Sequence, residues 1–381
     1  MAEESAHAAR EGVHFDMRFL HDRLLRDPAE ASSFDAFVAQ IQDAEMASTL
    51  AALRRPVVDV LHLRRFPCAS VVNVDNEAIA VAAAEHFLSR RFSEFAFCGR
   101  NGVAYSDERR GAFAALLAKR GFPCRVYDPP KAVARTLSHG GARRFGEAVD
   151  EPADARCLEK WVASLESGTA VFCCQDLRAY QLVRACCAKG VRVPDDIAVL
   201  GVDDDPLFCN FTDPKLSSVD PNAEEVGREA VRAVLESLGR ATGRCVARDR
   251  LVLPRGVTVR ESTDVYRMDH PWLGKALEFI HRDPSACITA ADVFAHVSLS
   301  HTIVDREFRA RLGTSVQKEI MKSRLDRAAE LLSNTSLPVA EVAARSGFAS
   351  FPYFCSSFSS RFGSTAARYR ALQKTKTKLH N

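Results

Sequence analysis

The apolar residues near the C-terminal end of the chain follow a helical period that occurs twice, fifty residues apart. Short apolar-periodic segments at 290–296 and 339–345 are each followed by a tight turn and a second helical segment. In those second segments the pairs Val304 and Phe308, and Phe354 and Phe358, are spaced four apart and fall on one helix face. That face can anchor the helix while the opposite face stays free. The pattern predicts two helix-turn-helix motifs.

A longer helical period separates the two motifs. Residues 315–333 place apolar side chains at helical spacing. At 1.5 Å per residue such a helix spans about 28 Å. We expect it to hold two recognition helices near the roughly 34 Å repeat of a DNA groove.

Residues 71–262 alternate short β-branched runs with amphipathic helical segments, which predicts an α/β fold with a parallel sheet covered by helices. Strands are expected at 71–74, 95–99, 170–174 and 197–202, and helices at 77–90, 110–120 and 177–189. Ligands bind such sheets at the carboxyl ends of the strands. Asp176 and Asp203 follow two of those ends.

Charge separates the same two regions. Residues 265–381 hold 17 Lys and Arg against 10 Asp and Glu, which leaves 35 against 39 for the rest of the 381-residue chain. The basic region is the one expected to meet DNA, and its tail at 375–381 is expected to seek phosphate. No apolar run is long enough for a membrane span and the first residues lack a signal-peptide core, so we expect a cytoplasmic protein without membrane contact.

The cysteines show no metal-binding spacing. None of the twelve forms a C-x-x-C pair, and several lie in apolar runs, so they are expected to be small core residues, with no metal and no cofactor. Cys124 lies in a Pro-Cys-Arg sequence faintly similar to the reactive site of DNA alkyltransferases. The activating histidine is missing there, and a helix-to-strand turn explains the segment equally well.

The C-terminal region resembles the AraC/XylS family of transcription regulators over about a hundred residues. The matching segments include Leu312-Gly313, Arg324-Leu325, residues 328–332 and 339–343, Gly347-Phe348, Tyr353-Phe354, Phe362-Gly363 and Arg368-Tyr369-Arg370. This resemblance implies groove-facing residues on both recognition helices: Thr302, Asp305, Arg306, Pro352 and Ser356. Ser359 and Ala366 depart from the family's usual basic residue and proline, so the second motif is expected to hold phosphate less firmly.

The region before it resembles the sugar-binding core of the LacI/GalR family. The matching segments are Val74-Asp75-Asn76, residues 106–113 and residues 193–204. The resemblance implies contacts to sugar hydroxyls from Ser106, Arg109, Asp176 and Asp203, which carboxylates and guanidinium groups can make in pairs. For each aspartate, a turn or helix-capping role is the alternative. Gln175 stands where that family usually has asparagine.

A LacI-type sensor joined to AraC-type helices is the arrangement of the xylose operon regulators. It implies a poorly defined extension at 1–33, a sensor at 34–264 and a DNA-binding domain at 268–374. The partners implied are a double-stranded operator, a pentose-like monosaccharide, RNA polymerase and a second copy of the chain. Because residues 1–33 lack a β-like run, we expect the N-terminal lobe of the sensor to be truncated.

Three functions remain open on the sequence. The first is a sugar-responsive transcription regulator. The second is a DNA-binding regulator whose sensor has degenerated into a ligand-free dimerisation domain. The third is an enzyme acting through Cys124, for which methyl transfer from alkylated DNA to the thiol would be diagnostic.

Overall fold

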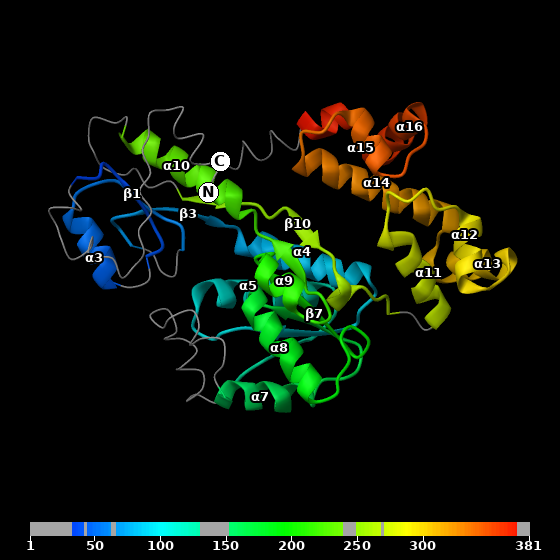
Figure 1. Cartoon of the computed structure of the whole chain (residues 1–381), viewed down its shortest axis with the longest axis horizontal. Coiled ribbons are helices and arrows are strands. Elements are labelled where there is room, and N and C mark those ends of the chain that lie inside the picture. The colour runs from blue at the N-terminus through cyan, green and yellow to red at the C-terminus, as the bar shows by residue number, and fades with distance from the viewer. Residues whose placement is uncertain are drawn as a thin grey trace. The chain divides into compact units, whose positions relative to one another are not determined.

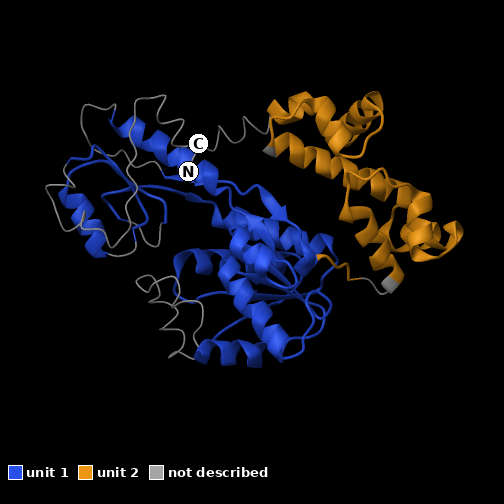
Figure 2. Cartoon of the chain, in the orientation of Figure 1, with its two compact units in different colours: residues 1–263 blue, residues 264–381 orange. Residues whose placement is uncertain are grey.

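The chain divides into two compact units, residues 1–263 and 264–381 (Figure 2). The computed structural model describes residues 33–41, 44–61, 66–129, 152–238, 249–267 and 270–371. The expectations for the extension at 1–33 and for the tail at 375–381 therefore lie outside the described residues, Ser33 excepted.

The first unit contains two parallel-stranded lobes. The N-terminal lobe has the strand order β1-β2-β3-β9, with every neighbouring pair parallel. These strands are β1 (Phe37–Ala39), β2 (Val57–Asp59), β3 (Ser70–Val74) and β9 (Arg250–Val252). Helix α3 (Ala44–Ala52) joins β1 to β2, and α10 (Ala223–Leu238) packs against all four strands (Figure 1).

The C-terminal lobe has the strand order β10-β8-β7-β6-β4-β5. Its strands are β4 (Glu94–Cys98), β5 (Cys124–Val126), β6 (Thr169–Cys173), β7 (Ile197–Val202), β8 (Ser217–Asp220) and β10 (Gly256–Thr258). All neighbours are parallel except the edge pair β8 and β10. Its helices are α4 (Asn76–Ser89), α5 (Ala104–Lys119), α7 (Pro152–Val162), α8 (Asp176–Ala188) and α9 (Pro206–Phe211).

The described chain crosses between the lobes three times: from β3 into α4, from β8 into α10, and from β9 into β10. Asp75 stands at the first crossing. Its carboxylate caps α4 by accepting from the N–H of Ala78 at 2.8 Å, and its own N–H donates to the carbonyl of Val252 at 2.8 Å. The two lobes are thus joined by neighbouring segments, and the carboxyl ends of their strands border the junction.

The strands and helices predicted from periodicity are present, and the α/β fold is confirmed. The strands agree within one residue at each end, because each is a buried apolar run bounded by polar turns. Two predicted helix ends are closed by Gly121 and Gly190, with φ of +85° and +68°, which side chains adopt at a cost. One boundary was wrong: the helix predicted at 110–120 begins at Ala104, so Ser106 and Arg109 lie within it.

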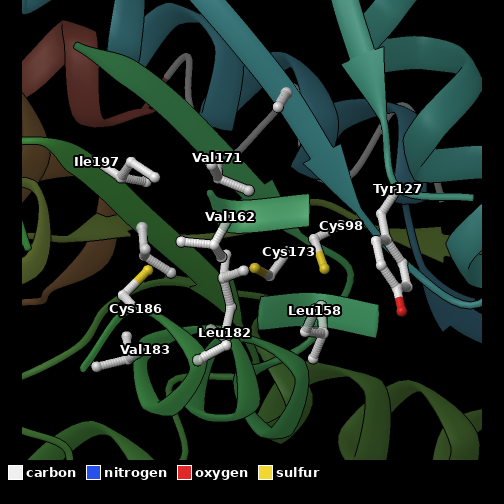
Figure 3. Close-up of a cluster of buried hydrophobic side chains, with 14 of the residues drawn as sticks. Cys98, Tyr127, Leu158, Val162, Val171, Cys173, Leu182, Val183, Cys186 and Ile197 are labelled. Carbon is white, nitrogen blue, oxygen red and sulfur yellow. The ribbon is translucent and has the colours of Figure 1, made fainter. Parts of the chain in front are cut away.

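The core of the C-terminal lobe includes several cysteines. Figure 3 shows Cys98, Cys173 and Cys186 among Leu158, Val171 and Leu182. Cys98 and Cys173 are opposite each other in the parallel ladder and neither is exposed to solvent. These cysteines pack as small apolar residues, as their placement in apolar runs predicted.

The second unit is helical and has two hydrophobic clusters. The first lies among α11 (Pro271–Arg282), α12 (Ala290–Val297), α13 (His301–Leu312) and the start of α14 (Val316–Asn334). The second lies among the rest of α14, α15 (Val339–Arg345) and α16 (Phe351–Phe362). Helix α14 is shared by both clusters, which matches the predicted helix at 315–333 within one residue at each end.

Candidate effector site and nucleic-acid interface

Three neighbouring parallel strands of the C-terminal lobe, β4, β6 and β7, end side by side. The loops and helix starts that follow them are residues 99–106, 174–176 and 203–205. All four residues predicted to contact a sugar lie at or just beyond this edge, which is where ligands bind parallel sheets. Asp176 and Ser106 face the interior of the protein, and Arg109 and Asp203 border the edge.

Arg109 is buried and held by its own chain. Its Nε donates to Oδ1 of Asn76 at 2.8 Å, and its Nη1 donates to the carbonyl of Cys174. The guanidinium carbon lies 5.2 Å from the ring centroid of Tyr105. Arg109 therefore connects the first crossing between the lobes to the end of β6.

Tyr105 and Gln175 complete this edge, although Tyr105 belongs to none of the motifs recognised in the sequence. The Tyr105 hydroxyl donates to Oε1 of Gln175 at 2.8 Å. Burial raises the pKa of Tyr105, while the positive charges of Arg100 and Arg109 lower it. The sequence could have indicated Tyr105 through its spacing from Arg109, because a residue four positions earlier lies on the same helix face.

Asp203 is exposed to solvent, yet protein atoms surround its carboxylate. Burial raises the pKa of Asp203 to about 6, and the charge of Arg109 acts in the opposite direction. The backbone of Asp203 has φ of +117°, a region that residues other than glycine rarely adopt, and its N–H donates to the carbonyl of Val219 at 3.1 Å. Asp203 is therefore reached by solvent while its carboxylate stays within the electrostatic reach of Arg109.

Asp176 faces the protein interior. Its Oδ1 accepts from the Ser218 hydroxyl at 2.6 Å, and its Oδ2 accepts from the N–H of Asp205 at 2.8 Å and from the Cys209 thiol at 3.4 Å. A side chain at Gly201 would overlap this carboxylate. Burial raises the pKa of Asp176 to about 7, and the bond from Ser218 opposes that shift. Asp176 thus fixes the loop that carries Asp203.

Ser106 also has a structural contact. Its hydroxyl accepts from the N–H of Arg100 at 2.8 Å, and its side chain is 1% exposed. A side chain at Gly99 would overlap it. Ser106 holds the loop between β4 and α5 in place, so its contribution to a ligand site is through that loop.

The helix-turn-helix motifs are built as the spacing predicted. Val304, Phe308, Phe354 and Phe358 are all fully buried. In the first motif, Thr289 forms a capping box with Asp292 at the start of α12, and Ser298 turns the chain in a left-handed conformation. The opposite faces of α13 and α16 stay largely exposed.

Four of the five residues predicted to face a groove are exposed: Thr302, Arg306, Pro352 and Ser356. Asp305 differs, because its carboxylate lies 3.0 Å from His301 and accepts from the N–H of Val316 at 3.4 Å. Arg309, which the motif analysis did not name, is exposed and seven residues beyond Thr302 on the same face. No side-chain hydrogen bond or ion pair of Arg309 occurs among the described residues.

The two motifs are linked by the turn at Gly347. Its φ is +77°, and a Cβ there would stand 2.5 Å from the carbonyl oxygen of Pro284. Arg324 of α14 donates from Nη2 to the carbonyl of Ile288 at 2.9 Å, close to the same turn. The turn of the second motif therefore packs directly on the segment that precedes the first motif.

Cys124 lacks the environment of a reactive thiol. Burial raises its pKa to about 12, so the nucleophilic thiolate is scarce near neutral pH. In the described part of the chain, no cluster of residues suited to a metal ion occurs. No described helix is long and apolar enough to cross a membrane.

Comparison with known proteins matches both units. The periplasmic binding protein-like domain family matches residues 84–263, and a helix-turn-helix domain family matches residues 294–372. The xylose operon regulatory protein of Haemophilus influenzae is 25% identical over 363 residues, covering 92% of this chain and 89% of its own. The chain is an XylR-like fusion of these two domains.

One further relative and one solved structure are also similar to this chain. The xylose operon regulatory protein of Escherichia coli strain K12 is 25% identical over 343 residues, covering 88% of this chain and 83% of its own. The solved structure of the xylose-binding transcription activator XylR covers 94% of this chain and 96% of its own, with a TM-score of 0.52 and 23% identity. At that identity the structure supports the fold alone.

Proposed function

We propose that this fusion is a DNA-binding transcription regulator whose first unit senses a monosaccharide. The observation that carries the proposal is the joint match of both units, in one order, to the xylose operon regulatory proteins. The division into a sensor at 34–264 and a DNA-binding domain at 268–374 is part of the proposal. We place it in the cytoplasm with its operator and RNA polymerase, and the relatives favour a pentose as effector.

The sensing site we propose consists of Asp203, Arg109, Tyr105 and Gln175. Asp203 offers an accessible carboxylate that accepts from adjacent sugar hydroxyls. Arg109, Tyr105 and Gln175 already form a fixed polar wall beside it. Asp176 and Ser106 act through the loops they hold, because their polar atoms are bonded within the protein.

The DNA-binding role predicts the effect of removing Arg306. Among the described residues this exposed side chain pairs only with Glu307 of its own helix, so it can turn to a base edge. Arg306→Ala should weaken binding to a selected operator by about 1–3 kcal/mol and relax specificity at one base pair. Arg309→Ala should do the same at a neighbouring position. Fluorescence anisotropy on a duplex selected from a random pool measures both.

Arg327→Ala is the matched control, because Arg327 lies on α14 and pairs with Glu330 at 2.8 Å. The operator affinity of Arg327→Ala should equal that of the unaltered chain. An equal loss by Arg306→Ala on operator and random duplex would show that Arg306 contacts only phosphate. If the full chain selects no sequence from the pool, the proposed function is wrong.

Dimerisation is proposed through helix α9. Leu207 and Phe211 lie four residues apart on it and are 55% and 81% exposed, an unusual pair of large apolar side chains on a soluble surface. A second copy of the chain is the occupant we propose, since most soluble oligomers are twofold dimers. Phe211→Asp should convert a dimer to a monomer in analytical ultracentrifugation, while Phe351→Asp, on exposed α16, should leave it dimeric. An unchanged mass for Phe211→Asp would assign the dimer to another surface.

A further inference from the structure

Arg100 occupies an unusual position at the edge of the proposed sensing site. It lies two residues after the end of β4, and the residue is 9% exposed. Its backbone N–H donates to Ser106, but the side-chain Nε and Nη2 are buried and have no hydrogen-bond partner among the described residues. Two buried donors of a permanent cation are therefore left unmatched.

The neighbours of this guanidinium belong to the sensing site. The positive charge of Arg100 lowers the pKa of both Tyr105 and Cys174, although burial raises both more strongly. Tyr105 also responds to the charges of Arg109 and Asp203. Arg100 therefore lies within electrostatic reach of Tyr105, a residue of the proposed sensing site.

No ion pair of Arg100 occurs among the residues that the structure describes. The four carboxylates of this edge have other partners. Asp176 accepts from Ser218, Asp205 and Cys209, and Asp203 lies in the field of Arg109. Asp204 pairs with Arg260, and Asp205 accepts from the N–H of Leu207. A buried charge without a counter-ion is unfavourable, and an arginine does not escape by losing its proton. The charge of Arg100 is therefore compensated only when an anionic group binds beside it.

We propose that the effector is a monosaccharide that carries an anionic group, a carboxylate or a phosphate, and that Arg100 binds this group. The inference rests on the proposed function and narrows its ligand class. Nε and Nη2 form one edge of the guanidinium with two parallel N–H bonds, which matches two oxygens of a carboxylate or phosphate. A neutral sugar satisfies those donors with hydroxyl oxygens but leaves the charge uncompensated. Asp203 then accepts from hydroxyls of the same ligand.

The test compares each neutral sugar with its anionic derivatives on the full chain. The probes are xylose, xylonate and xylose 5-phosphate, and glucose, gluconate, glucuronate and glucose 6-phosphate, measured by thermal shift and then by calorimetric titration. At least one anion should bind about 10- to 100-fold more tightly than its parent sugar. If only the carboxylates or only the phosphates bind more tightly than the parent sugar, that result identifies the anionic group of the effector.

Three variants separate anion binding from a purely structural role. Arg100→Gln should bring the preference for the anion close to parity and leave the affinity for the neutral sugar within about threefold. Arg100→Lys keeps the charge without the paired donors and should retain part of the preference. Arg120→Gln is the matched control, because Arg120 is exposed and pairs with Glu85. It should behave as the unaltered chain.

The outcomes are distinct. The anionic effector is overturned if the unaltered chain binds each neutral sugar more tightly than its anionic derivatives. It is also overturned if Arg100→Gln lowers the affinity for neutral and anionic ligands equally. Either result leaves the sugar-sensing function intact. If Arg100→Gln fails to fold, Arg100→Lys decides the question. A partly retained preference for the anion supports the role of the charge, and complete loss of that preference overturns it. Absence of binding by every probe overturns both the inference and the sensing role.

Discussion

Asp203→Ala should abolish the response of this regulator to its sugar while the protein still folds and binds its operator. The residue is exposed to solvent and follows the end of β7 directly. Its removal leaves sugar hydroxyls unpaired in the bound state, which costs about 2–4 kcal/mol, or roughly 30- to 700-fold in affinity. Calorimetric titration with the sugar that raises the melting temperature measures the loss.

Two other aspartates make the result specific. Asp195→Ala removes an exposed carboxylate that pairs with Arg192 at 3.4 Å, and it should leave sugar affinity unchanged. Asp176→Ala removes the acceptor of three internal donors, so it should lower the melting temperature as well as sugar affinity. Unchanged sugar binding by Asp203→Ala would exclude this edge as the site, whereas absence of sugar binding by the unaltered chain would favour the ligand-free dimerisation domain.

Asp154→Ala should produce the largest loss of stability among the substitutions considered. Asp154 of α7 pairs through both carboxylate oxygens with Arg178, whose side chain has no solvent exposure, and it accepts from the Tyr127 hydroxyl at 2.7 Å. Arg178 also lies over the Tyr127 ring, with 4.9 Å between guanidinium carbon and ring centroid. Loss of Asp154 leaves the buried charge of Arg178 without its counter-ion, although Nη1 still donates to Gln181, and such a loss costs about 3–5 kcal/mol.

Urea unfolding followed by circular dichroism measures this loss. Glu85→Ala is the control, because it breaks an ion pair with Arg120 in which both side chains are about half exposed. That change should lower the free energy of unfolding by less than about 1 kcal/mol. The double change of Asp154→Leu with Arg178→Met should recover most of the stability, since no buried charge remains. A loss in Asp154→Ala as small as the control's would show that water reaches Arg178.

The elements of both units were predictable because their signals are local. Buried strands such as β6 and β7 are uninterrupted apolar runs, and α13 and α16 present apolar pairs four residues apart. Capping residues and left-handed glycines mark the ends within a few residues. The start of α5 was misplaced by six residues, because Val103 provides no side-chain cap and the first turn lacks an apolar period.

The residues of the proposed sites were located from motifs, but their orientations were not. A strand followed by aspartate and a helix describes both an open ligand contact and a buried turn. Asp176 is the buried case because Ser218 and Cys209, far along the chain, supply its donors. Asp305 likewise bonds to Val316 at the start of the next helix. Only the tertiary structure singles out Tyr105, Arg100 and Arg309. Tyr105 contacts Gln175 and Arg109, two side-chain donors of Arg100 have no partner among the described residues, and Arg309 is exposed.

The contrast has a simple physical origin. Periodicity, caps and turns act between residues a few positions apart, so the strand and helix content, the two motifs and the division of charge were accessible from the chain alone. Hydrogen-bond partners and burial depend on segments far apart in sequence, as in the pairing of Asp154 with Arg178 and of Arg109 with Cys174. Folding alone decided which carboxylate stays open to a ligand and which arginine is left without a counter-ion.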